Sequence, residues 1–137
     1  MECGIRAYPT FGKRIMESPH KGKTGFTRLI NAFKYSCAGL QEAYRNEDAF
    51  RMELLLAIIL IPLAFWLEHS MMGRAAMIAC VMLVIIVELL NSAIEATVDR
   101  ISLDDHNLAK RAKDIGSAAV LISLINLVVV WLLVLLN

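Results

Sequence analysis

Five polar side chains recur on one side of a stretch, Ala75 to Arg100, that begins as an apolar run able to cross a bilayer. Counted from the first of them, the others stand at offsets of three, four, seven and eleven residues, so that all five fall within roughly 60° of one direction on a helix. A carboxylate at membrane depth is unfavourable unless it faces a partner, a cavity or an ion. The spacing therefore predicts a polar site on a membrane-embedded helix, formed by Glu88, Asn91, Ser92, Glu95 and Asp99.

Charged residues also flank the other apolar runs, with Glu47 before the first run and Lys113 and Asp114 before the last. Paired glutamates are hard oxygen ligands of the kind that Mg²⁺ accepts alongside waters and phosphates, and no cluster of His and Cys favours a softer metal. Lys113 could hold a phosphate as a point charge. Glu88 lies about 10 Å of helix rise deeper than Glu95, where a desolvated carboxylate suits a general base. This combination predicts phosphoryl transfer from an aqueous nucleotide to a lipid hydroxyl.

The composition indicates a membrane protein. The chain has 137 residues, of which 58% are hydrophobic and 20% charged, and a soluble domain of this size could not bury so much apolar side chain. The formal net charge is only +1, which gives no indication of nucleic-acid binding. We therefore expect a single all-α membrane domain.

The order of apolar and polar runs predicts one surface helix and three spans. Residues 1–24 are expected to form a polar extension without fixed structure. Residues 25–46 repeat apolar side chains at three- and four-residue steps, which favours an amphipathic helix in the membrane surface over one packed on protein. The spans are predicted at about 48–67, 72–99 and 117–136, with a polar loop over 101–116.

The distribution of basic residues predicts the orientation. Nine of the fourteen Lys and Arg residues lie between Arg6 and Arg51, and four lie between Arg100 and Lys113. The short turn at residues 68–74 holds only Arg74. By the positive-inside rule, we expect the N-terminus and the 101–116 loop to be cytoplasmic and Asn137 to face outward. The predicted site then lies at the cytoplasmic surface of the membrane.

Two sequence segments carry a family resemblance. They are ELLNSAIEATVDR at residues 88–100 and RAKDIGSAAV at residues 111–120, supported by GFTR at 25–28 and by the residues around Asn46 to Arg51. In these segments the chain resembles the bacterial prokaryotic-type diacylglycerol kinases, over residues 25 to about 131. The resemblance implies a kinase domain at 25–137 that makes phosphatidic acid from diacylglycerol with ATP and Mg²⁺. It also implies a homotrimeric bundle in contact with membrane lipid, with active sites shared between subunits.

The resemblance also implies roles for individual residues. Glu88 would take the proton from the lipid hydroxyl, and Glu47 and Glu95 would hold magnesium. Asn91, Lys113 and Asp114 would complete the phosphate site. The nucleotide and lipid would further contact Tyr35 and His106 near the adenine, and Arg28 near the lipid. The chain departs from the family pattern at Phe33 and Lys34, where small residues are expected.

Other interpretations remain open at this point. An undecaprenol kinase of the same fold would have the same site and a longer prenyl acceptor. A small proton-coupled transporter would use a membrane glutamate, and a non-enzymatic scaffold or holin would need no ordered polar face. Glu95 and Asp99 could also be merely solvated beyond the membrane, and His106 could be an exposed loop residue. Ser123 and Asn126, inside the last span, are expected to bond neighbouring helices.

Overall fold

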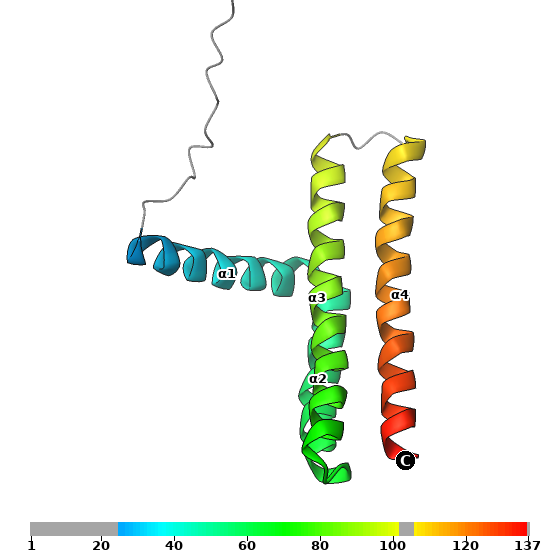
Figure 1. Ribbon diagram of the computed structural model, residues 1–137. Coiled ribbons are helices and arrows are strands. Elements are labelled where there is room, and N and C mark those ends of the chain that lie inside the picture. Colours follow the sequence, from blue (N-terminus) through cyan, green and yellow to red (C-terminus); the bar gives the residue numbers. More distant parts are fainter. Residues whose placement is uncertain (1–24, 102–105, 137) are drawn as a thin grey trace, which may run out of the picture. The chain divides into compact units, whose positions relative to one another are not determined.

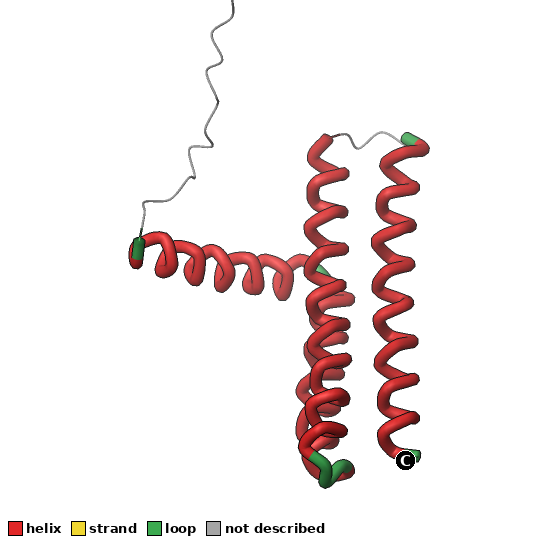
Figure 2. The backbone as a smooth tube through the Cα atoms, in the orientation of Figure 1, coloured by secondary structure: helices red, strands yellow, loops and turns green. Residues whose placement is uncertain are grey.

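The computed structural model describes residues 25–101 and 106–136, and every regular element within these ranges is a helix (Figure 2). The elements are α1 (Phe26–Asn46), α2 (Asp48–Leu67), α3 (Met71–Ile101) and α4 (Asn107–Leu135). The all-α class is thereby confirmed for the described ranges. The predicted N-terminal extension, residues 1–24, lies outside them. The chain divides into two units with the boundary after Ser36, and the cluster described below lies in the second.

Helix α1 begins directly after Gly25, whose φ of 83° lies in the left-handed region that glycine adopts without strain. Its large apolar side chains, among them Phe26, Leu29 and Phe33, are exposed. A side chain of α2 caps the C-terminal end of α1. Arg51 Nη1 donates hydrogen bonds of 3.1 Å to the carbonyl oxygens of Tyr44 and Arg45. These are carbonyls that a helix end leaves without an internal partner, so Arg51 satisfies the junction between α1 and α2.

Helices α2 and α3 form an antiparallel hairpin with a tight turn. Ser70 N donates to Glu68 Oε1 at 2.7 Å, and Gly73 N donates to Ser70 Oγ at 3.0 Å. Hydrogen bonds from the Ser70 hydroxyl and the Ser70 backbone N–H lower the pKa of the Glu68 carboxyl below its usual range. Because the turn is so short, the start of α2 must lie beside the middle of α3, and this sets Glu47 and residues near Glu88 at similar heights.

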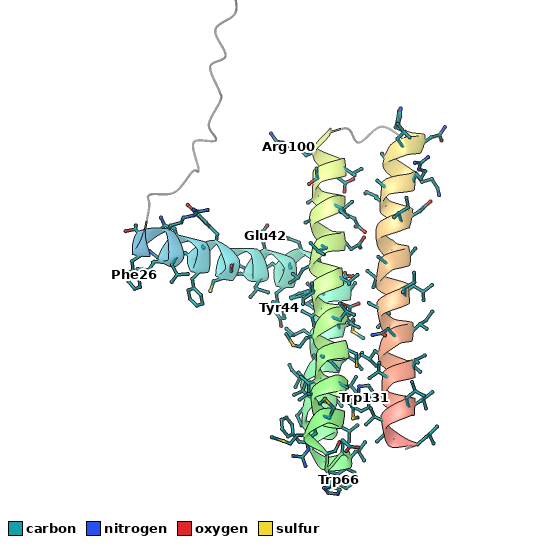
Figure 3. The ribbon with its side chains drawn as sticks, viewed as in Figure 1. Phe26, Glu42, Tyr44, Trp66, Arg100 and Trp131 are labelled. Atoms are coloured by element: carbon teal, nitrogen blue, oxygen red, sulfur yellow. The ribbon has the colours of Figure 1, made fainter. Side chains whose placement is uncertain are left out.

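Helix α4 runs antiparallel to α3 along its length (Figure 1). Trp131, labelled in Figure 3, donates from Nε1 to the carbonyl oxygen of Met77 at 3.3 Å and so fixes the register of the two helices. Moving fourteen residues along each helix from this pair brings Asn91 of α3 level with Ser117 of α4. The buried apolar residues gather around the same contact, and the largest buried fully are Met77 and Val84.

Helices α2, α3 and α4 are each long and apolar enough to cross a membrane, over Asp48–Leu67, Met71–Arg100 and Asn107–Leu135. Many of their large apolar side chains are exposed, which suits surroundings of lipid or of other membrane helices. Trp66 lies near one end of the hairpin and Arg100 near the other (Figure 3). The three predicted spans therefore correspond to three helices.

The predicted loop over 101–116 is wrong for residues 107–116, which are the first turns of α4. His106 caps this helix, since its Nδ1 accepts a hydrogen bond of 3.2 Å from Leu108 N. Lys110 and Asp114 then form an i, i+4 ion pair of 2.7 Å, and Ala, Lys and Arg in this segment are strong helix formers. The polar composition of residues 107–116 favours a loop, but these residues are both polar and helical.

Candidate functional site

The polar face of α3 is real and partly buried. Only 3% of Glu88 and 9% of Asn91 is exposed, although both are polar residues in the middle of an apolar helix. Buried carboxyl and amide groups are retained only where they have partners or a function. The face of α3 that the sequence periodicity predicts is thus buried at Glu88 and Asn91, and its functional role stays a prediction.

Asn91 and Glu95 interact within this face. Asn91 Nδ2 donates a hydrogen bond of 3.0 Å to Glu95 Oε1, one turn further along α3. The bond aims the amide nitrogen at the carboxylate and leaves the Asn91 Oδ1 atom buried without a partner among the described residues. The Asn91 amide group therefore has a hydrogen-bonded donor, Nδ2, and an acceptor, Oδ1, that has no partner in the described part of the chain.

Lys113 joins α4 to this face through Asp99. The Lys113 Nζ to Asp99 Oδ1 distance is 2.6 Å, and 37% of the lysine side chain and 49% of the aspartate side chain are exposed. Solvent screens a pair of this exposure, so its contribution to stability is small. Its structural result is that a cation from α4 lies against the acidic face of α3, close enough for its charge to interact with Glu95 as well.

Carboxylates are concentrated around Glu88. The charge of Glu95 acts on Glu88 most strongly and that of Glu47 less so, which means that residues from α2 and α3 share one electrostatic environment. Glu47 reaches this position because it directly precedes α2 and is only partly exposed there. Repulsion among carboxylates is relieved by a bound cation or by protonation.

Glu53 belongs to the same group of carboxylates, and the sequence alone did not indicate this. It is 9% exposed, its charge repels that of Glu88, and its Oε2 atom is buried without a hydrogen-bond partner among the described residues. In the sequence it stands in the polar first turns of α2 and resembles an interfacial residue. The available signal was the short turn after α2, which brings position 53 to the depth of Glu88 in an antiparallel hairpin.

The donor set fits magnesium without forming a closed cage. The described ranges hold no group of three or more His, Cys, Asp or Glu side chains arranged to bind a metal ion. Mg²⁺ is usually held by one or two carboxylates together with substrate phosphates, so an open pair such as Glu47 and Glu95 has suitable chemistry. Each of the two lies near enough to Glu88 for its charge to act on that residue.

Four of the predicted site residues are not brought into this cluster by the contacts of the structure. Asp114 is 61% exposed at its side chain and pairs with Lys110 on its own helix. His106 caps α4, as described above. Arg28 and Tyr35 are exposed on the part of α1 that belongs to the first unit. Their nucleotide and lipid roles stay predictions.

Comparison with known proteins gives one consistent result. The family model for prokaryotic diacylglycerol kinase matches residues 34–135. The chain is 56% identical over 120 residues to the diacylglycerol kinase of Pseudomonas aeruginosa, a match covering 88% of this chain and 98% of that protein. It is 52% identical over 112 residues to the diacylglycerol kinase of Escherichia coli K12, covering 82% of this chain and 92% of that protein. The corresponding Helicobacter pylori 26695 protein is 44% identical over 115 residues, covering 84% and 89%.

These similarities extend over all four helices and include the whole polar face of α3 together with Lys113. Three helices able to span a membrane agree with a multi-pass protein of the bacterial inner membrane. Both the architecture and the sequence matches lead to the same conclusion: the chain belongs to the prokaryotic diacylglycerol kinase family and is a membrane-embedded lipid kinase.

Proposed function

We propose that the residues around Glu88 transfer the γ-phosphoryl group of ATP directly to the hydroxyl of diacylglycerol, producing phosphatidic acid. The reaction class is that of the family. The observation that carries the site assignment is the burial of Glu88, which is only 3% exposed. The charges of Glu47 and Glu53, at and after the start of α2, interact with it. A buried carboxylate at this depth can meet an alcohol that stays dissolved in the membrane.

Within this proposal Glu88 accepts the proton of the lipid hydroxyl as the oxygen attacks phosphorus. Lys113 supplies positive charge to the phosphates, and its present partner Asp99 shows that its ammonium group already lies at the edge of the acidic face. Asn91, anchored on Glu95, orients a phosphate or the attacking group. Magnesium, when bound by Glu47 and Glu95, would neutralise phosphate charge that accumulates in the transition state.

The topology follows from the same proposal. ATP is an aqueous substrate, so the acidic face must open to the cytoplasm, which is also the side that the positive-inside rule assigns to the N-terminus. Helix α1, with exposed apolar side chains such as Leu29 and Phe33, would lie in the membrane surface.

The apolar faces left exposed on the spanning helices would form the contacts of a homotrimer with shared active sites. Cross-linking of purified protein in detergent tests this, and a yield of monomers alone would contradict it.

The deciding experiment measures transfer from radiolabelled ATP to short-chain diacylglycerol by purified protein. We expect labelled phosphatidic acid from the wild type and a loss of roughly a thousandfold in kcat for Glu88→Gln, because a general base contributes about 10² to 10⁴ in rate. Glu42→Gln is a matched control, since Glu42 is exposed on α1 and accepts a hydrogen bond from Asn46 one turn away. Normal turnover by Glu88→Gln would refute its role as the base.

An undecaprenol acceptor is the alternative substrate, because the same site could serve a longer prenyl alcohol. The similarity to proteins named diacylglycerol kinase favours diacylglycerol. Parallel assays with both lipids at equal concentration separate the two. A higher kcat/KM for undecaprenol would reassign the acceptor while leaving the phosphoryl-transfer chemistry in place.

A further inference from the structure

Gly116 lies where α4 meets the polar face of α3 at Asn91. It is buried, and a Cβ atom built on it would overlap the Asn91 Oδ1 atom and lie 3.3 Å from Asn91 Cγ. An alanine at this position therefore needs the space that the Asn91 amide occupies. No backbone atom makes this close contact, so a methyl group would displace one side chain in particular.

The backbone gives no reason for glycine here. Among the described residues with positive φ, Gly25 is the sole member, so Gly116 has a helical conformation that alanine adopts readily. Glycine inside a helix is less favourable than alanine because it loses more backbone freedom on folding. A residue that costs helix stability without serving backbone geometry is explained here by the group that it accommodates.

The Asn91 side-chain amide is restrained at its nitrogen and at its oxygen. Asn91 Nδ2 donates to Glu95 at 3.0 Å, while Oδ1 is buried against α4 without a hydrogen-bond partner in the described part of the chain. The hydrogen bond restrains the nitrogen, and only packing restrains the oxygen. Residue 116 lies beside this oxygen, because a Cβ atom added there would overlap it.

We propose that Gly116 is a positioning residue, whose missing side chain leaves the space in which the Asn91 amide sits with its nitrogen toward Glu95. The inference rests on the proposed function for its catalytic consequence, but the contact itself can be tested without turnover. A methyl group at position 116 would turn or push the amide and weaken its hold on Glu95. Because small displacements at a reacting centre lower rates strongly, the main effect should be on kcat.

The first test is a double-mutant cycle on thermal stability of the full-length protein in detergent, with no substrate present. Gly116→Ala should lower Tm in the wild-type background, where the methyl group meets Asn91. In the Asn91→Ala background the same change should leave Tm unchanged or raise it, because the obstruction is gone and alanine is the better helix former. An equal loss of Tm in both backgrounds would overturn the proposal, as would failure of both Gly116→Ala and the double variant to fold.

Gly39→Ala is the matched control, because Gly39 is also inside a helix and has no atom within 4 Å of an added Cβ. It should leave Tm unchanged or raised in both backgrounds. A Gly39→Ala effect that depended on Asn91 in the same way would show that the cycle reports something other than the contact, and would also overturn the proposal.

The second test measures kinetics on the folded protein. Gly116→Ala should lower kcat about tenfold or more and raise the magnesium concentration at half-maximal rate, with KM for diacylglycerol little changed. Unchanged kcat and magnesium dependence would overturn the catalytic part of the proposal. If the wild type transfers no phosphate to diacylglycerol, the proposed function fails, while the Tm cycle still decides whether Gly116 holds Asn91.

Discussion

The interface between α3 and α4 has two segments of opposite character. The apolar segment, Met77–Ile85 of α3 with Leu127–Trp131 of α4, is closely packed. The polar segment, Glu88–Asp99 of α3 with Lys113–Gly116 of α4, carries the residues proposed to act in catalysis. Both segments lie on the same two helices, so the difference between them is a difference of side chains alone (Figure 1).

The polar atoms of the two segments are treated differently. In the apolar segment the indole nitrogen of Trp131 and the thiol of Cys80 both bond the carbonyl oxygen of Met77. In and beside the polar segment, buried oxygen atoms of Asn91, Ser92 and Glu53 lack partners within the described residues. Buried polar atoms are ordinarily paired. The apolar segment therefore holds α3 and α4 together with its polar atoms paired, whereas the polar segment has buried oxygen atoms without partners in the described ranges.

The largest effect on stability is expected in the apolar segment. Trp131→Ala removes a buried ring and the hydrogen bond to Met77, and we expect it to lower the free energy of unfolding by about 3–5 kcal/mol. Denaturation in detergent, followed by helical circular dichroism, measures this. The exposed Trp66→Ala, whose side chain is mostly outside the packing, is the control. A larger loss at Trp66 than at Trp131 would break the distinction.

The largest effect on rate after Glu88 is expected from Lys113. Lys113→Met keeps the aliphatic stem and removes the charge, and should lower kcat/KM for ATP about 10²- to 10³-fold. Its stability should change by no more than about 1 kcal/mol, because the Asp99 pair is more than one third exposed on each side. Lys110→Met, on the same helix, is the control. Equal rate losses in the two variants would remove Lys113 from the site.

A smaller effect is expected from Glu53. Glu53→Gln removes one of two repelling carboxylates and keeps the shape, and it should raise the free energy of unfolding by about 1 kcal/mol in the absence of magnesium and nucleotide. Thermal unfolding at neutral pH measures the change, with the exposed Glu42→Gln for comparison. A clear destabilisation would show that the Glu53 carboxylate has a cationic partner in the assembled protein.

The smallest effect concerns the turn between α2 and α3. The Ser70 hydrogen bonds lower the folded-state pKa of Glu68, so they stabilise the protein above the unfolded value near 4.5. This contribution is lost as pH falls below 4.5 through the lowered value. Ser70→Ala removes the hydroxyl and keeps the backbone N–H. The Tm difference between wild type and this variant should therefore be largest at neutral pH and shrink toward pH 3, as thermal scans over that range would record. A difference that grew on acidification would reverse the assignment.

Much of the polar face of α3 could be predicted from the sequence because it is local to one helix. Glu88, Asn91 and Glu95 recur at helical spacing, and the apolar run around Glu88 indicates its burial. The contributions that cross between helices were missed. Glu53 became a neighbour of Glu88 only through the hairpin register, and Gly116 acquired its meaning only from the side chain opposite it.

The beginning of α4 was also missed, for a different reason. Hydropathy locates the apolar part of a helix, whereas the helix itself begins where its backbone is capped, at His106. The fold class and the three spans could be inferred because apolar length alone determines them. The proposed homotrimer would use apolar surfaces that, in the sequence, have the same composition as surfaces facing lipid.

Helix α3 has 31 residues and α2 has 20, so α3 continues well beyond the start of its neighbour. Glu88 and Glu95 lie on this helix at depths that differ by about 10 Å. A bilayer that thickens or thins by a few ångströms would therefore move the water boundary from one glutamate toward the other. Membrane thickness itself becomes a variable of the reaction, and lipids of different chain length should alter the rate even when the acceptor is unchanged.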